Sequence, residues 1–206
     1  MTQNKFLFGI TGGSGCGKTT VSDIFRNLGY EIIDCDKISR EISAKSSPCL
    51  SELKSVFGEK ILLPDGSLDR KALGNIVFSS QASLKTLNDI THKYILEEIY
   101  KRAGISKSRM VGIDGAVLIE SGVSKKCRRM IAVLADRKIR AQRIIKRDKL
   151  TPEEAEKRIN SQKVDNFYIE NCDYILYNNS DRAMLENQVR EVSLKLEEGR
   201  KKDMEF

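Results

Sequence analysis

The chain has 206 residues, a length that fits one compact domain with a small inserted segment. Hydrophobic residues make up 40% of it and charged residues 32%, so the composition supports a folded core and excludes a disordered chain. The formal net charge of +7 suits a polyanionic ligand, although a solvated basic surface explains the charge equally well.

The cysteine, histidine and hydropathy patterns argue against two further classes. Five cysteines without a Cys-x-x-Cys pair, beside a single histidine, argue against a Cys/His zinc site and predict reduced thiols. The N-terminus does not resemble a signal peptide, and no apolar run approaches the ~20 residues that span a bilayer. We therefore expect a cytoplasmic protein without a membrane partner.

Short apolar runs alternate along the chain with longer amphipathic stretches, which is typical of a parallel sheet covered by helices. The runs occupy residues 5–10, 30–34, 109–114, 130–135 and 173–178. The stretch between the second and third runs has a mostly helical pattern and is too long for a simple crossover. The sequence therefore predicts an α/β fold with a five-stranded parallel sheet and an inserted helical domain at about 41–104.

Local signals predict turns and helix ends within this pattern. "LPDGS" at 63–67 predicts a turn inside the insertion. Thr151, Pro152 and Glu154 predict a capped helix start, because they supply the cap, the first helical residue and the capping-box glutamate. An amphipathic helix is expected over 181–199, with residues 200–206 frayed.

A glycine-rich segment between the first predicted strand and a predicted helix matches G-x-x-x-x-G-K-[ST]. Its glycines let successive N–H groups point at phosphate oxygens, and the helix N-terminus adds positive partial charge. An ordinary glycine turn is the alternative. The segment, called the phosphate loop below, is expected to bind nucleotide through Gly12, Gly13, Ser14, Gly15, Cys16, Gly17, Lys18, Thr19 and Thr20.

Three side chains of this loop have specific expected roles. Lys18 is expected to bridge the β- and γ-phosphates, and the Thr19 hydroxyl to bind Mg²⁺. Cys16 is interpreted as a small filler and not as a redox group.

Acidic residues follow two of the predicted strands. Asp34 and Asp36 stand at the carboxyl end of the second strand, where ligands gather on open parallel sheets. A carboxylate there can accept a hydroxyl proton during phosphoryl transfer, and a helix N-cap before "KISREI" is the alternative role. Asp114 ends the third strand and is predicted to reach the hydrated Mg²⁺, with a buried strand-end turn as the alternative.

Arginines recur with helical spacing after the fourth predicted strand. Arg140, Arg143 and Arg147 have the i, i+3, i+7 spacing that places them on one helical face, and Arg158 follows on the next helix. Guanidinium groups suit a phosphoryl group whose charge spreads in the transition state. A solvated helix surface is the alternative.

Taken in order, these elements resemble the dephospho-CoA kinase family, and the resemblance covers nearly the whole chain. The phosphate loop is common to many nucleotide-binding proteins, whereas the later segments are more specific. These are "IIDCDKISRE", "GSLDRKALGNIVF", "LNDITHKYI", "RIIKRDKLTPEEAEKRINSQ" and "CDYILYNNS". The resemblance implies a P-loop NTPase-type three-layer α/β/α fold with a core at 1–40, 105–140 and 172–206, a CoA-binding insertion at about 41–104 and a lid at about 141–171.

The resemblance also implies ATP-dependent phosphorylation of the ribose 3′-hydroxyl of dephospho-CoA, the last step of coenzyme A synthesis, with ATP and Mg²⁺ as cofactors. By this resemblance Asp36 becomes the general base, with Asp34 less favoured, and Arg143 a lid-side charge stabiliser. The catalytic set is then Asp36, Lys18 and Arg143. The resemblance further implies that Arg147 and Asn178 contact ATP, and the metal is expected at Thr19 and Asp114. The residues expected to bind the acceptor are Asp34, Asp36, Asp69, Arg70, His92 and Leu118.

Ordinary structural roles remain open for several of these residues. The chain also departs from the family pattern at some positions. His92 can be an ordinary helix-face histidine, and Asp69 with Arg70 a cap and its surface neighbour. Where the family has D-x-P-L-L-[FY]-E, this chain reads "DGAVLIE", with Gly115 and Ala116 in place of a stiffer pair. Lys93 replaces a proline and Ser180 a glycine.

Two rival functions are a nucleoside or nucleotide monophosphate kinase and an ATP-regulated nucleic-acid-binding module. The helical insertion argues against the first. Aromatic residues at 6% and the absence of tryptophan argue against the second. We expect a small-molecule substrate, no nucleic-acid partner, and a monomer or weak homo-oligomer.

Overall fold

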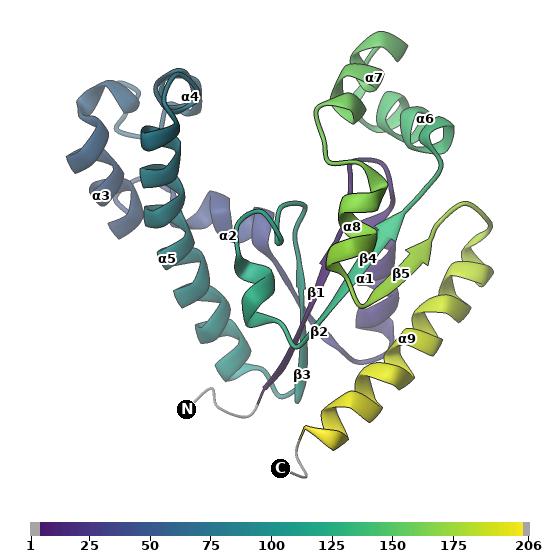
Figure 1. Cartoon of the computed structure of the whole chain (residues 1–206). Helices are drawn as coiled ribbons and strands as arrows, with labels where there is room; N and C mark the ends of the chain where they lie inside the picture. The colour runs from purple at the N-terminus through teal and green to yellow at the C-terminus, as the bar shows by residue number, and fades with distance from the viewer. Residues whose placement is uncertain (1–4, 204–206) are drawn as a thin grey trace. The chain divides into compact units, whose positions relative to one another are not determined.

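The computed structural model describes residues 5–203 and contains every predicted strand, with bounds that differ from the prediction by at most one residue. In chain order the elements are β1 (Phe6–Thr11), α1 (Lys18–Asn27), β2 (Glu31–Asp34), α2 (Cys35–Ile42), α3 (Pro48–Phe57), η1 (Glu59–Ile61), α4 (Arg70–Phe78), α5 (Gln81–Ile105), β3 (Met110–Asp114), η2 (Val123–Lys126), β4 (Arg129–Leu134), α6 (Arg137–Asp148), α7 (Pro152–Asn160), α8 (Asp165–Asn171), β5 (Tyr174–Tyr177) and α9 (Arg182–Lys202). Figure 1 shows their course along the chain.

The chain divides into two compact units. One is formed by the described residues up to 33 and from 105 onward, and the other by residues 34–104. We call them the core unit and the insertion unit.

The strands form one sheet in the order β2-β3-β1-β4-β5. β1 pairs in parallel with β3, where Ile10 faces Asp114, and with β4, where Thr11 faces Ala132. β4 pairs in parallel with β5, where Leu134 faces Tyr177. Because parallel strands end at the same edge, the residues that follow β1, β3, β4 and β5 meet there, which is where an open α/β sheet binds ligands.

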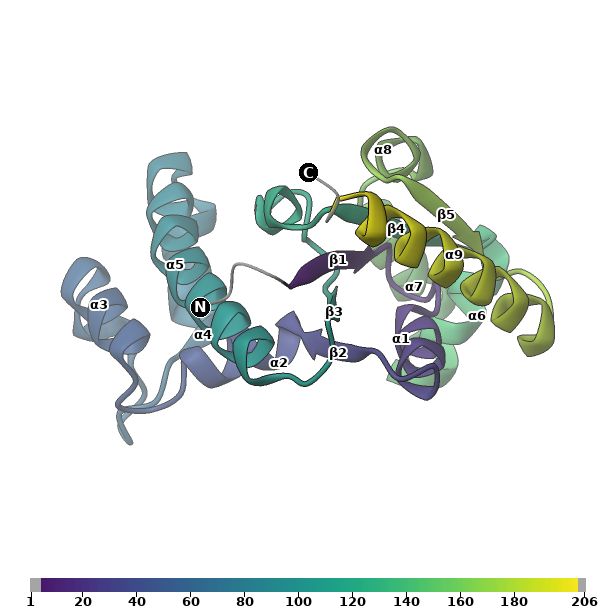
Figure 2. The same cartoon turned by 90° about the horizontal axis from the view of Figure 1, so that it is seen from below.

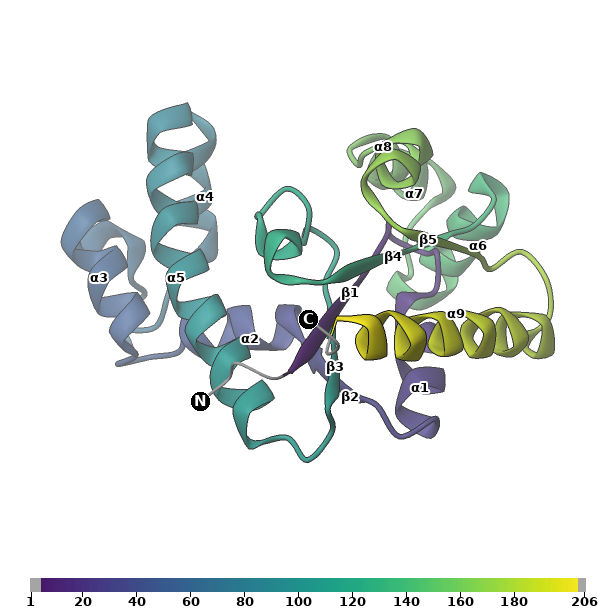
Figure 3. The same ribbon diagram turned by 60° about the horizontal axis from the view of Figure 1, so that its bottom comes forward.

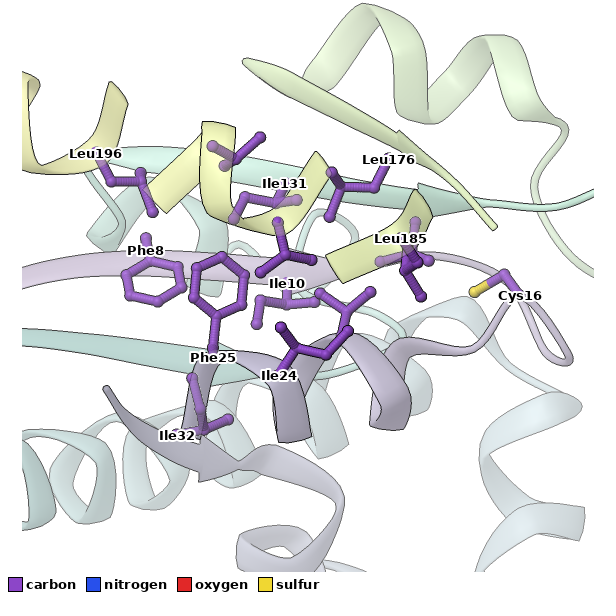
Figure 4. Packing of buried hydrophobic residues seen from close by; sticks show 14 of the residues in the cluster. Phe8, Ile10, Cys16, Ile24, Phe25, Ile32, Ile131, Leu176, Leu185 and Leu196 are labelled. Carbon is purple, nitrogen blue, oxygen red and sulfur yellow. The ribbon is translucent and has the colours of Figure 1, made fainter. Parts of the chain in front are cut away.

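The larger hydrophobic core of the core unit lies between the sheet and two helices. Alternate residues of the central strands, among them Phe8 and Ile131, pack with Phe25 of α1 and Leu185 of α9 (Figure 4). The rings of Phe8 and Phe25 lie 5.1 Å apart. α1 and α9 run side by side on this face of the sheet (Figure 2).

The opposite face of the sheet is covered in part by α8, which the sequence analysis did not predict. Ala132 and Leu134 of β4 point to this face and pack with Tyr168 of α8. Figure 3 shows α8 and α9 on opposite sides of β4 and β5. The core unit is therefore the three-layer α/β/α arrangement that the sequence predicted.

α6 and α7 pack against one another through Ile144, Ala155 and Ile159. The start of α7 is as predicted: the Thr151 side chain accepts from the backbone N–H of Glu154, and the Glu154 side chain completes a capping box. The prediction that residues 200–206 fray is wrong for residues 200–202, because α9 continues to Lys202. Residues 204–206 lie outside the described part of the chain.

The insertion unit has its own core between α3, α4 and α5, which includes Leu53, Ile61 and Leu73. The predicted turn at 63–67 is present, with the Gly66 N–H donating to the Leu63 carbonyl at 2.8 Å. Among the described residues, no helix is both long enough and apolar enough to cross a membrane.

Burial predicts unreactive thiols at two positions of the core unit. It raises the pKa of Cys127 and of Cys172 to about 12, so at pH 8 both are protonated and not nucleophilic. We expect iodoacetamide to alkylate both at least ~10-fold more slowly in the native protein than in urea, by peptide mapping. Equal rates in the native and unfolded states would contradict this.

Candidate active site

The phosphate loop leaves β1 after Thr11 and enters α1 at Lys18. Gly15 and Gly17 have φ angles of 79° and 94°, a region that favours glycine. A Cβ on Gly17 would lie 2.1 Å from Asn178 Nδ2, and one on Gly12 would lie 2.3 Å from the Val133 carbonyl oxygen. The glycines are thus required by close contacts within the protein as well as by the expected phosphate.

Replacing Gly17 by alanine tests these contacts. Gly29 is a matched control, because its φ of 89° is similar and nothing lies within 4 Å of a Cβ there. Both substitutions carry the cost of a left-handed backbone, about 1–3 kcal/mol. We expect Gly17→Ala to lower the free energy of unfolding in urea by at least ~1 kcal/mol more than Gly29→Ala, because it also displaces Asn178. Equal losses would contradict the contact with Asn178.

The loop's reactive side chains differ in exposure. Lys18 Nζ donates to the Gly12 carbonyl at 3.0 Å, while the Thr19 side chain is exposed. Cys16 is 1% exposed and belongs to the hydrophobic core, and burial raises the pKa of its thiol although Lys18 and Arg140 oppose this shift. The filler interpretation of Cys16 is therefore confirmed for its side chain.

Two arginines of the predicted stripe on α6 hold the phosphate loop by its carbonyls. Arg140 is only 6% exposed, and its Nε donates to the Ser14 carbonyl at 3.0 Å. Arg143 Nη1 donates to the Gly15 and Cys16 carbonyls at 3.3 and 3.4 Å. The alternative of a solvated helix surface is wrong for Arg140.

Arg147, the third arginine of the stripe, is more exposed. It pairs with Asp148 at 2.8 Å, and its Nη2 donates to Ser14 Oγ at 3.4 Å. The Asp148 hydrogen bond raises the pKa of the Arg147 guanidinium. Arg158 of α7 also pairs with Asp148, so this carboxylate joins α6 to α7.

Asn178 follows β5 and is 7% exposed. Its backbone N–H donates to the Leu134 carbonyl at 2.8 Å, and its side-chain Nδ2 donates to the Cys16 carbonyl at 2.9 Å. Its backbone carbonyl accepts from Arg143 Nη2 at 3.1 Å. Asn178 therefore joins the end of the sheet to the phosphate loop and to α6.

The side chains expected to bind the metal are hard oxygen donors of the core unit. Asp114 ends β3, and its Oδ2 accepts from Ser22 Oγ at 2.7 Å. Ser22 lies one turn after Thr19 on α1, so the carboxylate and the Thr19 hydroxyl are both tied to the start of this helix. Within residues 5–203 no cluster of three or more His, Cys, Asp or Glu could hold a metal. One carboxylate and one hydroxyl fit Mg²⁺, which keeps several waters and binds substrate phosphates.

Asp34 and Asp36 belong to the insertion unit and differ in their contacts. Asp34 is the N-cap of α2, and its Oδ1 accepts from the Lys37 N–H at 2.9 Å. Asp36 lies in the first turn and is exposed, and its side chain makes no hydrogen bond or ion pair with the described residues. The cap role considered for the residue before "KISREI" is therefore filled by Asp34 and not by Asp36.

One of the residues expected to bind the acceptor, Asp69, is the N-cap of helix α4. Asp69 accepts from the Lys71 and Ala72 N–H groups at 2.9 Å, which confirms the cap alternative, and Arg70 donates to Ser43 Oγ at 2.9 Å. His92 of α5 is half-buried, and desolvation lowers its pKa although Asp89 opposes this.

Leu118, also expected to bind the acceptor, lies in the core unit. It is 2% exposed, packs beside Gly9, and its carbonyl accepts from the Ser124 N–H at 2.9 Å. These contacts leave little of Leu118 for direct contact with a substrate.

Comparison with known proteins identifies the family. A family model described as dephospho-CoA kinase matches residues 6–183, which include the phosphate loop, the insertion unit and α6 to α8. The chain belongs to the dephospho-CoA kinase family. It is therefore a kinase, and both rival functions considered from the sequence are set aside.

Individual relatives agree with this family. A dephospho-CoA kinase from Fusobacterium nucleatum is 39% identical over 176 residues, which cover 85% of this chain and 90% of that protein. A solved dephospho-CoA kinase from Campylobacter jejuni aligns over 94% of this chain and 98% of its own, with a TM-score of 0.64 and 28% identity. A shikimate kinase from Bacteroides thetaiotaomicron, at 15% identity and a TM-score of 0.52 over 93% and 98% of the two chains, shares the fold.

Sequence reasoning missed two polar residues of the site of this kinase. The expected site residues did not include Arg140. Arg140 belongs to the arginine stripe, and it is the most deeply buried of the three arginines in that stripe. Gln162, which ends "RINSQ", was not singled out; its side chain contacts both Ser14 and Arg140. The spacing of the stripe could have indicated Arg140, whereas no local signal indicated Gln162.

Proposed function

We propose that the protein transfers the γ-phosphoryl group of ATP to the ribose 3′-hydroxyl of dephospho-CoA, giving ADP and CoA. The observation that carries this proposal is the family match over residues 6–183, which spans the phosphate loop, the insertion unit and the arginine stripe.

The phosphate loop is the proposed site of the ATP phosphates. Its backbone N–H groups and the N-terminus of α1 supply fixed positive partial charge. Lys18 exchanges its hydrogen bond with the Gly12 carbonyl for contacts with the β- and γ-phosphates, and a charge placed in advance stabilises the transferring group without reorganisation.

Arg143 and Arg147 are proposed to contact ATP from the lid region. The contacts of Arg143 with Gly15, Cys16 and Asn178 hold its guanidinium in place before the nucleotide arrives. This pre-organisation favours stabilisation of the charge that develops on the phosphoryl oxygens. Thr19 and Asp114 would hold a magnesium ion, which would neutralise phosphate charge.

Asp36 is proposed as the general base. As the oxygen of the 3′-hydroxyl bonds to the γ-phosphorus, the bond from that phosphorus to the bridging oxygen breaks, ADP leaves, and the hydroxyl proton passes to Asp36. The exposed carboxylate of Asp36 is available for this, whereas Asp34 Oδ1 is used by the cap of α2. Asp69, Arg70 and His92 remain proposed acceptor-side residues, whereas the buried Leu118 is proposed to support that side without direct contact.

An acceptor competition tests the proposal. ADP formation would be measured with dephospho-CoA, adenosine, uridine and pantothenate, and the product identified by mass spectrometry. We expect kcat/KM for dephospho-CoA to exceed that for each other acceptor by at least ~10²-fold, because a site that hydrogen-bonds one substrate rejects analogues lacking those groups. Preference for adenosine or uridine would contradict the proposal. A cytoplasmic location and a monomeric or weakly oligomeric state remain predictions from the sequence.

A further inference from the structure

The side-chain oxygen of Gln162 occupies a position where two donors of the site converge. Gln162 Oε1 accepts from the backbone N–H of Ser14, in the phosphate loop, at 2.8 Å. The same oxygen accepts from Arg140 Nη2 at 2.9 Å. Gln162 lies between α7 and α8, in the same compact unit as the loop.

These two donors are of the kind that proteins use to bind phosphate. Backbone N–H groups of a glycine-rich loop bind phosphoryl oxygens, and guanidinium groups pair with them. A charged phosphate oxygen forms hydrogen bonds about twice as strong as those of a neutral amide oxygen. A phosphate oxygen arriving at the loop is therefore a better acceptor for both donors than Gln162.

The surroundings allow the exchange. A Cβ on Gly13 would lie 2.3 Å from Arg140 Nη2 and 3.0 Å from Gln162 Oε1, so a side chain at position 13 would displace this pair. Gln162 and Arg140 also line a cavity of about 580 Å³, together with Asn160, Lys163 and Asp165. The released Gln162 side chain has room and polar partners in this cavity.

We propose that Gln162 holds the phosphate-binding donors in the absence of nucleotide and is displaced by a phosphate oxygen of ATP, so that it lowers and thereby sets the affinity for ATP. The inference rests on the proposed function only in that ATP binds the phosphate loop. It does not depend on which acceptor receives the phosphoryl group.

The test is calorimetric titration with Mg·ATP in the absence of any acceptor. Gln162→Met keeps the length of the side chain and removes the oxygen, and Gln162→Ala removes the whole amide. We expect ATP to bind both variants at least about twofold more tightly than the wild type, since the two hydrogen bonds that compete with the phosphate, from the Ser14 N–H and from Arg140, are lost. Gln162→Glu should bind ATP at least ~10-fold more weakly, because its carboxylate competes more strongly for Arg140 and repels the phosphates.

Gln188 of α9 supplies a matched control. Its Oε1 accepts from the Tyr177 backbone N–H at 2.9 Å and its Nε2 donates to the Tyr177 carbonyl at 3.0 Å. Gln188→Ala therefore removes a similar side chain to backbone contact that involves no residue of the phosphate loop, and its ATP affinity should equal that of the wild type. Unfolding midpoints would show that each variant is folded.

Unchanged or weaker ATP binding in both Gln162→Met and Gln162→Ala would overturn the inference, and it would make Gln162 a supporting or nucleotide-contacting residue instead. Failure of the acceptor assay alone would overturn the proposed function and leave these titrations valid. A wild type that does not bind ATP would overturn both.

Discussion

Lys18→Ala is expected to lower kcat by at least ~10²-fold while the protein remains folded. Within residues 5–203 Lys18 Nζ has one hydrogen bond, to the Gly12 carbonyl, so loss of this side chain lowers the free energy of unfolding by only about 0.5–1.5 kcal/mol. The loss of activity arises because the substitution removes a fixed positive charge from the β- and γ-phosphates. Steady-state kinetics with saturating ATP and dephospho-CoA measure it.

Lys195→Ala is the matched control for this substitution. Lys195 is an exposed lysine of α9, in the same compact unit, and its loss changes the net charge by the same amount. Its kcat should stay within about twofold of wild type, because exposed positions away from the site tolerate substitution. A folded Lys18→Ala variant with near wild-type turnover would show that the phosphate-loop assignment is wrong.

Asp36→Asn is expected to lower kcat by about 10²- to 10⁴-fold, because the amide is nearly isosteric but cannot accept the hydroxyl proton. ATP affinity should change little, since the acceptor hydroxyl and not the nucleotide loses its partner. The measurement is kcat for dephospho-CoA beside an ATP titration of the same variant.

Asp34→Asn supplies the comparison two residues away. An asparagine caps a helix about as well as an aspartate, so the cap of α2 persists and stability is nearly unchanged. We expect only a small loss of kcat. If Asp34→Asn shows the large loss and Asp36→Asn does not, then Asp34 is the base.

Features that depend on neighbouring residues in the chain were predictable from the sequence. The apolar run at 5–10 became β1 because period and β-propensity are local properties, and the capping box of α7 needed only Thr151, Pro152 and Glu154. The phosphate loop was recognisable because glycines at fixed spacing before a lysine have one common structural use.

Features that depend on contacts between distant segments were not predictable in this way. The short helix α8 has no strong local signal and is held by Tyr168 packing on Ala132 and Leu134. Asp34 and Asp36 are alike in sequence terms, and the start of α2 decides which of them becomes the cap.

The sequence by itself determined the five strands, the phosphate loop and the arginine stripe, because each is a pattern of residues close together in the chain. Only the tertiary structure decided that position 17 must be a glycine because the Asn178 side chain lies against it. The tertiary structure also decided that Arg140 is buried against the Ser14 carbonyl and that Gln162 accepts from the Ser14 N–H. The physical reason is that these partners lie more than a hundred residues apart, so the packing of α6, α7 and β5 around the end of the sheet brings them together. Hydrogen-bond distances of about 3 Å result from that packing and leave no periodic signal in the sequence.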